Sequence, residues 1–405
     1  MQTTINHKFL TNPDVEDAES ILRSCVHCGF CTATCPTYQL LGDELDGPRG
    51  RIYLIKQVLE GNEISSRTQS HLDRCLTCRS CETTCPSGVR YGRLVEIGRE
   101  IVDQQVPRNL LQRMSRKLLR KIVPYPQRFA MLYKLGLLFR PVLPATLKRK
   151  LPLPQTTSNI IVASKARKML VLQGCVQSVV TPQTNQAATR ILQKLDIELI
   201  AAPEAGCCGA VSHHLSAPEE GLDFMRRNID AWWPIIEQGV EAIVVTASGC
   251  GAVIKDYVDL LKHDTHYADK ARRVSALAKD ISEILHGENL AAVTTEQSAS
   301  KVAFHSPCTL QHGQKITGVV EQILQKAGFT LTHVEDSHLC CGSAGTYSIL
   351  QPKLSQQLLD NKLSALQCEQ PDLIATANIG CQMHMASKAQ VPVKHWLELI
   401  DKNLV

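Results

Sequence analysis

The sequence predicts an α+β multidomain protein, in which an N-terminal helical ferredoxin-type domain and a basic helical linker precede two repeated parallel α/β units. Two internal repeats and an uneven distribution of charge lead to this prediction. The segment from Cys25 to Pro36 recurs 50 residues later, from Cys75 to Pro86. A longer pattern of Cys, Cys-Cys-Gly and Gly-Cys occurs twice in the C-terminal half. Cys368 is the one cysteine outside both repeats.

The composition excludes several classes of protein. A chain of 405 residues, 44% of them hydrophobic, is long enough for two or three domains with apolar cores. Its 17 cysteines are too sparse for a disulfide-stapled miniprotein and too many for a few buried thiols. The N-terminus has no apolar segment after a basic start, so we expect no secretory signal and reduced thiols in the cytoplasm. No apolar run reaches the ~18 residues of a membrane-spanning helix.

The first domain, residues 1–103, carries the spacing C-x2-C-x2-C-x3-C-P twice. In two-cluster ferredoxins, three thiolates of such a motif bind one [4Fe-4S] cluster and the fourth binds the other cluster. We therefore expect two [4Fe-4S] clusters, the first on Cys25, Cys28, Cys31 and Cys85, and the second on Cys75, Cys78, Cys81 and Cys35. Zinc is the alternative, but a zinc site would leave half of each motif unexplained. Two neighbouring clusters predict transfer of single electrons rather than a reaction site.

Helices are expected around these motifs. Residues Arg49 to Glu60 form a predicted helix whose apolar residues share one face, before Gly61 and Asn62 end it. Several arginines near the motifs would favour reduced clusters or attract an acidic partner, and the alternative is a solvated basic face. They are Arg74, Arg79, Arg90 and Arg93.

The linker, residues 104–158, belongs to a strongly basic zone. From Gln104 to Leu195 the chain has no Asp or Glu and carries 17 Lys and Arg. A predicted helix from Val106 to Ile122 sets a leucine-rich face against a basic face. We expect this zone to lie against the membrane surface or against acidic subunits. The alternative is that its leucines pack into the first domain and its arginines are solvated. Nucleic acid is excluded as a partner, because aromatic residues spaced for base stacking are missing.

Two Cys-Cys-Gly modules follow, at residues 159–290 and 291–405. Each alternates short apolar strands with helices, which predicts a parallel sheet with ligands beyond the carboxyl ends of its strands. The predicted strands are Lys168–Leu172, Ile197–Ala202 and Ala242–Ala247, then Val302–Phe304, Thr330–Val334 and Asp372–Thr376. The predicted helices are Pro182–Leu195 and Pro218–Gln238, then Val319–Ala327 and Leu350–Leu366. The cysteines fall where strands end.

Each module thus offers four thiols to a further iron–sulfur or zinc centre. They are Cys175, Cys207, Cys208 and Cys250 in the first module, and Cys308, Cys340, Cys341 and Cys381 in the second. Buried structural thiols without a cofactor are the alternative. Histidines lie near these cysteines, but a lone histidine is more often a core or surface group than a ligand, so none is assigned to a site. No motif for a dinucleotide or a nucleoside triphosphate is visible, so flavin and substrate chemistry are expected elsewhere.

The two cysteine motifs, the intervening segment DGPRGRIYLIKQVLEG and the two Cys-Cys-Gly modules together resemble the glycolate oxidase iron-sulfur subunit family. The resemblance covers nearly the whole chain. It implies a complex in which two flavoprotein subunits oxidise glycolate to glyoxylate, while this subunit has no catalytic residues and carries electrons towards a membrane quinone or another acceptor. It also implies a cytoplasmic protein, peripheral on the inner face of the cell membrane.

The sequence departs from the fullest Cys-Cys-Gly pattern, which closes with Cys-x-x-Cys. Ala247 and Asn378 stand at the earlier of these two positions. A five-cysteine cluster is therefore not expected, and each module is left with a four-cysteine centre or none. The resemblance also implies a helical ferredoxin domain like that of relatives of heterodisulfide reductase and of anaerobic glycerol-3-phosphate dehydrogenase. An iron–sulfur subunit of either kind, a thiol–disulfide reductase using the Cys-Cys-Gly centres and a metal-stabilised assembly scaffold are the alternative functions.

Overall fold

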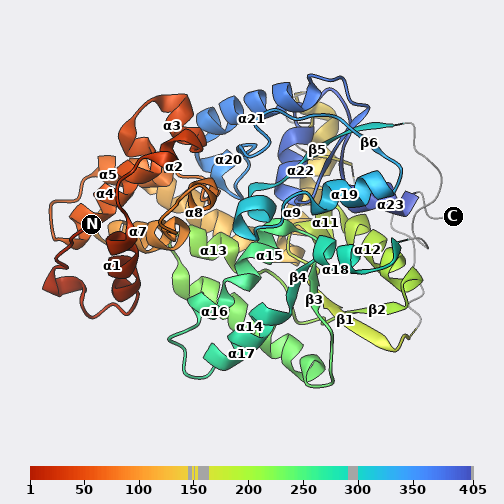
Figure 1. Cartoon of the computed structure of the whole chain (residues 1–405), viewed down its shortest axis with the longest axis horizontal. Coiled ribbons are helices and arrows are strands. Elements are labelled where there is room, and N and C mark those ends of the chain that lie inside the picture. Colours follow the sequence, from red (N-terminus) through yellow and green to blue (C-terminus); the bar gives the residue numbers. More distant parts are fainter. Residues whose placement is uncertain (145–147, 150, 154–163, 291–299, 403–405) are drawn as a thin grey trace.

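A computed structural model of the chain describes residues 1–144, 148–149, 151–153, 164–290 and 300–402. Within these residues a helical N-terminal region precedes two α/β units, each with a four-stranded parallel sheet, and the predicted fold class is confirmed. Figure 1 shows the N-terminal helices at one side of the molecule, in red and orange, and the two α/β units at the other side, in green and blue. The predicted boundaries at 158/159 and 290/291 lie outside the described residues, and the domain limits stay a prediction.

The N-terminal region consists of short helices around one apolar core. Its helices are α1 (Asp14–Ser24), α2 (Phe30–Ala33), α3 (Pro36–Leu41), α4 (Pro48–Leu59), α5 (Ser66–Asp73), α6 (Ser80–Thr83) and α7 (Tyr91–Gln105), with 3₁₀ turns η1 (His7–Phe9) and η2 (Glu44–Asp46). The predicted helix at 49–60 is α4, which begins with Pro48 at its first position, where the missing N–H costs nothing. Ile55 of α4 is fully buried against α7. A side chain at Gly98 of α7 would lie 2.6 Å from Ile55, so these helices require glycine there.

The first module builds its sheet in the order β2-β1-β3-β4. Its strands are β1 (Arg167–Val171), β2 (Ile197–Ala201), β3 (Ile243–Val245) and β4 (Ala278–Asp280). Its helices are α11 (Gln177–Val180), α12 (Pro182–Lys194), α13 (Ala210–His214), α14 (Pro218–Ile236), α15 (Ser248–Lys255), α16 (Tyr257–Leu260), α17 (Ala268–Leu277) and α18 (Ile281–Gly287). Leu170 of β1 pairs with Ile243 of β3, and the chain positions after both strands carry cysteines. The crevice at these two strand ends is where ligands bind in such sheets.

The second module repeats this order as β6-β5-β7-β8. Its strands are β5 (Lys301–His305), β6 (Thr330–Leu331), β7 (Leu373–Thr376) and β8 (Val393–His395). Its helices are α19 (Val319–Lys326), α20 (Tyr347–Leu350), α21 (Pro352–Gln367), α22 (Ile379–Ala386) and α23 (Trp396–Lys402), with a π-helical turn η5 (Thr309–Gly313). The predicted helix at 350–366 corresponds to α21. The predicted strand from Thr330 to Val334 is only two residues long.

Each sheet has a fourth strand that was not predicted. β4 and β8 are three residues long and contain lysine, so no apolar run marks them in the sequence. The helices after them tie the modules together, since α18 contacts α19 of the second module and α23 contacts α12 of the first module. One apolar cluster therefore extends across both modules, from Val171 in β1 to Phe304 in β5.

The basic linker forms α8 (Leu110–Ile122), α9 (Pro126–Phe139) and the short turn η3 (Arg140–Val142). The predicted helix at 106–122 begins at Leu110 instead of Val106, because α7 continues to Gln105 and Asn109 caps the next helix. No described helix of the chain combines the length and the apolar character needed to cross a membrane.

The alternative for α8, in which its leucines pack into the first domain and its arginines are solvated, does not describe its orientation. Leu111 and Leu118 are 80% and 61% exposed. Arg116 instead faces the protein and donates a hydrogen bond of 3.0 Å to Asp73 of α5. Arg120 approaches Glu220 of the first module at 3.5 Å. The basic residues thus fasten α8 to the molecule, and its leucines face outward.

Candidate iron–sulfur and metal centres

The two C-x2-C-x2-C-x3-C-P motifs have the same backbone path. His27 and Thr77, at equivalent positions, both have a positive φ, of 57° and 52°. The residue that begins the short helix inside each motif is also left-handed, with Gly29 at 85° and Arg79 at 60°. A left-handed backbone at a residue other than glycine is held there by its surroundings. The duplication in the sequence is therefore a duplication in structure.

Thiols from both motifs line a first hollow of about 420 Å³, which is open in part to solvent. Its cysteines are Cys25, Cys28, Cys31, Cys81 and Cys85. Burial, followed by the neighbouring Cys25 thiol, raises the pKa of Cys31 to about 11, as expected for crowded thiols without a cation among them. Cys28 is exposed, and the large apolar side chains of Val26 and Phe30 beside it are exposed as well.

A second hollow, of about 290 Å³, lies next to the first. Its cysteines are Cys35, Cys75, Cys78 and Cys81, so Cys81 and the ring of Tyr91 line both hollows. The structure therefore brings together Cys85 with the first three thiols of the first motif, and Cys35 with the first three thiols of the second motif. The assignment of these sets to particular clusters stays a prediction.

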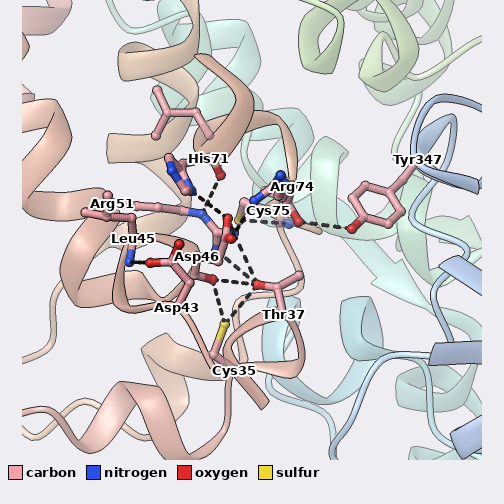
Figure 2. Close-up of polar contacts among 12 residues, drawn as sticks. Cys35, Thr37, Asp43, Leu45, Asp46, Arg51, His71, Arg74, Cys75 and Tyr347 are labelled. Carbon is pink, nitrogen blue, oxygen red and sulfur yellow. Dashed lines mark hydrogen bonds and ion pairs between the residues drawn. The ribbon is translucent and has the colours of Figure 1, made fainter. Parts of the chain in front are cut away.

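Polar contacts around Asp46 hold the loops of the second hollow (Figure 2). Asp46 is fully buried and accepts hydrogen bonds from His71 Nδ1 at 2.9 Å and from Arg74 at 2.7 Å. Its carbonyl oxygen accepts a hydrogen bond of 2.7 Å from Thr37, whose hydroxyl lies 3.3 Å from Cys35 Sγ. This network fixes the fourth cysteine of the first motif against the helix that leads to the second motif.

Buried arginines give the second hollow a positive surrounding. Arg51 is 1% exposed and donates a hydrogen bond of 2.7 Å to the carbonyl oxygen of His71. Burial raises the pKa of the Cys75 thiol, but the charges of Arg51 and Arg99 outweigh this effect and the pKa is lowered. Tyr91 donates a hydrogen bond of 3.6 Å to Cys75 Sγ. Positive charge and hydrogen bonds to sulfur stabilise an anionic iron–sulfur centre.

The four arginines noted near the motifs all form ion pairs within the chain. Arg74 pairs with Asp46, and Arg93 pairs with Asp14. Arg79 and Arg90 pair across the domain boundary with Asp256 and Asp259 of the first module. Arg79 and Arg93 are largely buried and so do not form the solvated face that was the alternative, whereas the Arg90 side chain is 52% exposed. Arg79 and Arg90 link the motif domain to the first module.

The first module brings its four cysteines into one row, in which Cys175, Cys207 and Cys208 are buried and Cys250 is partly buried. The Cys207 thiol accepts hydrogen bonds from Cys175 and Cys208, which holds its pKa well below the ordinary value, and Cys208 also contacts Cys250. Gly209 has φ 92°, and a side chain there would lie 2.7 Å from a backbone oxygen of α14. The Cys-Cys-Gly sequence thus lets the cysteine pair sit directly on that helix.

The second module repeats this arrangement with an added imidazole. Cys308 Sγ lies 3.9 Å from Cys340 Sγ, and the Cys341 thiol contacts both Cys340 and Cys381. The last residue of β5, His305, places a ring nitrogen within 4.8 Å of the Cys341 and Cys381 sulfurs. No histidine was assigned to a site from the sequence. The signal was the position of His305 at the carboxyl end of a central strand, three residues before a repeat cysteine.

The second cysteine motif lies directly against the second module. Cys78 belongs to an apolar cluster with Cys308, Cys340 and Leu76. Burial, followed by the neighbouring Cys308, raises the pKa of the Cys78 thiol well above its ordinary value. Thiols of three separate segments therefore lie together where the second cysteine motif meets the second module.

Comparisons with known proteins agree with this arrangement. The 4Fe-4S dicluster domain family matches residues 21–89, and the Cysteine-rich domain family matches residues 169–255 and 302–386. The glycolate oxidase iron-sulfur subunit of Escherichia coli strain K12 is 56% identical over 405 residues, which cover 100% of this chain and 99% of that protein. The chain belongs to the glycolate oxidase iron-sulfur subunit family. The resemblance noted in the sequence is confirmed.

Two further proteins bear on the family and the fold. A probable glycolate oxidase iron-sulfur subunit from Bacillus subtilis strain 168 is 31% identical over 401 residues, covering 91% of this chain and 89% of that protein. A crystal structure of a hypothetical protein from Helicobacter pylori superposes with a TM-score of 0.53 over 98% of this chain and 73% of that chain. At 11% identity the second likeness concerns the fold alone.

The positions at which this member of the glycolate oxidase iron-sulfur subunit family departs from the fullest Cys-Cys-Gly pattern face each other. Ser248, next to Ala247, donates a backbone hydrogen bond of 3.0 Å to the carbonyl oxygen of Ala377. Asn378 donates a hydrogen bond of 3.4 Å to Cys381 Sγ and accepts one of 3.4 Å from the backbone of Gly249. The asparagine thus couples the second module's cysteine to the first module, where a cysteine would have added a ligand.

One buried ion pair joins the motif domain to the first module. Glu96 of α7 lies 3.3 Å from His213 Nε2 and 3.4 Å from His214 Nδ1, both on α13 directly after the Cys-Cys-Gly sequence. Burial alone would raise the pKa of Glu96. The two histidines lower it by more than burial raises it, so the pKa lies well below its ordinary value. Cys368 lies at the end of α21, exposed and outside every thiol cluster described above.

Proposed function

We propose that this chain carries single electrons in a glycolate-oxidising complex, from two flavoprotein subunits through two [4Fe-4S] clusters towards a membrane quinone or another acceptor. The first cluster is held by Cys25, Cys28, Cys31 and Cys85, and the second by Cys75, Cys78, Cys81 and Cys35. The names of the Escherichia coli and Bacillus subtilis relatives support glycolate oxidation as the reaction of the complex. This chain contributes conduction, and its own residues position the clusters.

The observation that carries the proposal is the pair of adjoining hollows with Cys81 and Tyr91 in the wall of both. Each proposed set of four thiols lines one hollow, with Cys81 also in the wall of the first, and four thiols are the donor set of a [4Fe-4S] cluster. Because each hollow takes its fourth thiol from the other motif, neither cluster can be held without both halves of the domain in place. Adjacent clusters exchange electrons without any movement of the chain.

The exposed rim of the first hollow is the proposed entry point for electrons. Cys28 is exposed, whereas Cys75 and Cys81 of the second hollow are buried. Val26 and Phe30 are 68% and 60% exposed on either side of Cys28. Exposed apolar side chains around a thiolate ligand are suited to a protein partner, because docking buries them and brings the partner's flavin near the cluster.

The modules and the linker complete the proposal. The eight module cysteines, Cys175, Cys207, Cys208, Cys250, Cys308, Cys340, Cys341 and Cys381, are proposed to hold one or two further iron–sulfur or zinc centres, the second of which lies against Cys78. The outward leucines of α8 are proposed to bind the inner face of the cell membrane as an interfacial helix. Peripheral contact would place the chain close to a quinone acceptor.

The deciding experiment uses the complex purified anaerobically through an affinity tag on this chain. Glycolate added to the complex should reduce the clusters, with the appearance of two magnetically coupled centres in low-temperature electron paramagnetic resonance (EPR). The copurifying proteins should contain flavin. A Cys28→Ser chain should block this reduction, while the Cys368→Ser chain should behave like the wild type. Stoichiometric zinc without iron, or glycolate-dependent dye reduction that persists after deletion of the gene, would overturn the proposal.

A further inference from the structure

The second module contains a buried imidazole with one nitrogen left over. His305 is 2% exposed, and its Nδ1 lies 3.1 Å from Thr376 Oγ1. Its Nε2 has no hydrogen-bond partner in the part of the chain that the structure describes. A buried polar atom without a partner costs about 1–3 kcal/mol. A buried Nε2 without a hydrogen-bond partner indicates that a ligand binds to this nitrogen.

Two thiols lie where that ligand would bind. A ring nitrogen of His305 and the sulfurs of Cys341 and Cys381 all lie within 4.8 Å of one another. Because Nδ1 is engaged with Thr376, Nε2 is the nitrogen free to face the sulfurs. Zinc binds nitrogen at about 2.0 Å and thiolate sulfur at about 2.3 Å, so ligands of one ion lie no more than about 4.6 Å apart. Small adjustments of these side chains would close such a site.

The geometry differs from that of the cluster-binding motifs. Among the described His, Cys, Asp and Glu side chains, no three thiols of the two cysteine motifs lie within 4.8 Å of one another. Thiols that surround a [4Fe-4S] cluster must stay far enough apart to contain it. His305, Cys341 and Cys381 are closer together, as ligands of a single ion are.

We propose that His305, Cys341 and Cys381 bind one zinc-type divalent ion in the second module. Cys340 contacts Cys341 but is not among the side chains that lie within 4.8 Å of one another, so the proposed protein ligands are these three. This inference rests on the proposed function for the existence of a metal in this module. It makes the second module a zinc-bound support for the adjacent cluster instead of a third electron carrier.

The surroundings of the three side chains fit this ion. Two thiolates balance the charge of a divalent cation, so the filled site is neutral in a buried position. Thr376 Oγ1 can accept the Nδ1 proton of His305 and fix the tautomer in which Nε2 is a ligand, which is the usual outer contact of a zinc-bound histidine. Lys362 is buried nearby and donates a hydrogen bond of 2.7 Å to the carbonyl oxygen of Asp336, so it does not occupy the site.

The first module cannot form the same site. Cys175 and Cys308 are equivalent in the repeat, so the residue equivalent to His305 is Leu172. Leu172 is buried in the apolar core of the first module. The substitution His305→Leu therefore gives the second module the residue that the first module tolerates at the same place.

The test measures metal content of the intact chain, purified anaerobically. We expect about one zinc per chain in addition to the iron of the two clusters. His305→Leu should remove most of the zinc while the iron content and the cluster EPR signals stay unchanged. His333→Leu, at an exposed histidine of the same module, is the matched control and should keep the zinc. His305→Cys should restore it, because a third thiolate can replace the imidazole.

A cobalt-substituted chain supplies a readout that does not depend on stability. Tetrahedral cobalt with thiolate ligands has strong visible absorption, and His305→Cys should shift these bands towards a purely thiolate set. If His305→Leu does not fold, this shift decides alone. Full zinc content in a folded His305→Leu chain, unshifted cobalt bands in His305→Cys, or a third iron–sulfur signal in place of zinc would overturn the proposal. Missing iron in the two cysteine motifs would instead contradict the proposed function.

Discussion

Tyr347 of α20 donates a hydrogen bond of 3.1 Å from its hydroxyl to the backbone carbonyl oxygen of Arg74 (Figure 2). Arg74 immediately precedes Cys75, so a residue of the second Cys-Cys-Gly module holds the first cysteine of the second motif. Tyr347 packs in the same cluster as Cys308 and Cys340. The motif domain and the second module are thus joined directly beside the cysteines of both.

Removing this hydrogen bond should loosen the second motif. Tyr347→Phe keeps the ring and loses a contact worth about 1 kcal/mol, which corresponds to about fivefold faster opening of the loop at residues 74–80. Hydrogen–deuterium exchange of the intact chain would measure the rate. Tyr53→Phe, at a tyrosine that is half exposed on α4, should leave the exchange unchanged. Equal exchange in Tyr347→Phe and the wild type would show that the contact does not fix the loop.

The crossed fourth ligands give a prediction that distinguishes two assignments. In the crossed arrangement Cys85 binds the cluster of the first motif, because it lines the hollow that contains Cys28. The EPR spectrum of Cys85→Ser should therefore resemble that of Cys28→Ser and differ from that of Cys78→Ser. In an uncrossed arrangement the spectrum of Cys85→Ser would instead resemble that of Cys78→Ser. Cys368→Ser should have the spectrum of the wild type.

Electron entry at the first hollow can be tested separately from cluster binding. Phe30→Asp places a charge in the exposed apolar rim beside Cys28 and should weaken docking of the flavoprotein. We expect glycolate-dependent reduction of the clusters to slow by about tenfold or more, a loss of about 1.4 kcal/mol in docking. Reduction by dithionite should be unchanged. Ile349→Asp, at an exposed residue of the second module, is the control, and an equal effect of both substitutions would argue against this entry point.

The sequence was sufficient for the parts of the fold that repeat. Apolar periodicity located α4, α12 and the central strands, and cysteine spacing indicated which thiols would meet. It did not locate β4 and β8, because strands of three residues are too short for any period. It also could not decide which face of α8 is covered. A helical period shows that Leu111 and Leu118 share a face, but only the positions of Asp73 and Glu220 determine that the basic face is the one turned inward.

His305 illustrates the same limit for a site. The position of His305 three residues before a repeat cysteine is a weak signal, because a histidine near a cysteine is more often a core or surface group than a ligand. Its neighbours Cys341 and Cys381 are distant in sequence, and they meet it because β6 and β7, which precede them, both pair with β5 in one parallel sheet. Long-range pairing of this kind is set by the whole fold.

The buried ion pair at Glu96 should make stability depend on pH. The pKa of His213 is raised, because the pull of Glu96 outweighs the lowering effect of burial. The lowered pKa of Glu96 contributes stability above about pH 4.3, which is lost as the pH falls through its folded value. The raised pKa of His213 contributes stability below about pH 6.5, which is lost as the pH rises through its folded value. The contact between α7 and α13 is therefore strongest in mildly acidic solution.

Glu96→Gln should abolish this dependence. The thermal midpoint of the wild type should fall between pH 6 and pH 9 more steeply than that of Glu96→Gln, because only the wild type loses a charge pair in that interval. The substitution should also cost about 3–5 kcal/mol at pH 6, as expected when one partner of a buried pair is removed. Glu16→Gln, at an exposed position, should keep the slope of the wild type. An unchanged slope in Glu96→Gln would place the pH dependence elsewhere.

The outward face of α8 should bind lipid mainly through its leucines. Arg116 and Arg120 are engaged with Asp73 and Glu220, so fewer positive charges face outward than the sequence suggests. Flotation of the purified chain with phosphatidylglycerol–phosphatidylethanolamine vesicles should therefore weaken only in part at high salt, since apolar contact is not screened.

Replacing two of these leucines should remove the vesicle binding that persists at high salt. The double variant Leu111→Glu with Leu118→Glu replaces two apolar side chains by charged ones. Complete burial of one leucine side chain in the lipid interface contributes about 1.5–3 kcal/mol to binding, and each substitution removes this contribution. We expect flotation to fall by more than tenfold, while Leu10→Glu, at an exposed leucine before α1, keeps it. No flotation of the wild type even at low salt would contradict the lipid contact. Loss of flavoprotein binding in the double variant would then assign this face of α8 to a partner subunit, because exposed apolar side chains gathered on one face are typical of an interaction site.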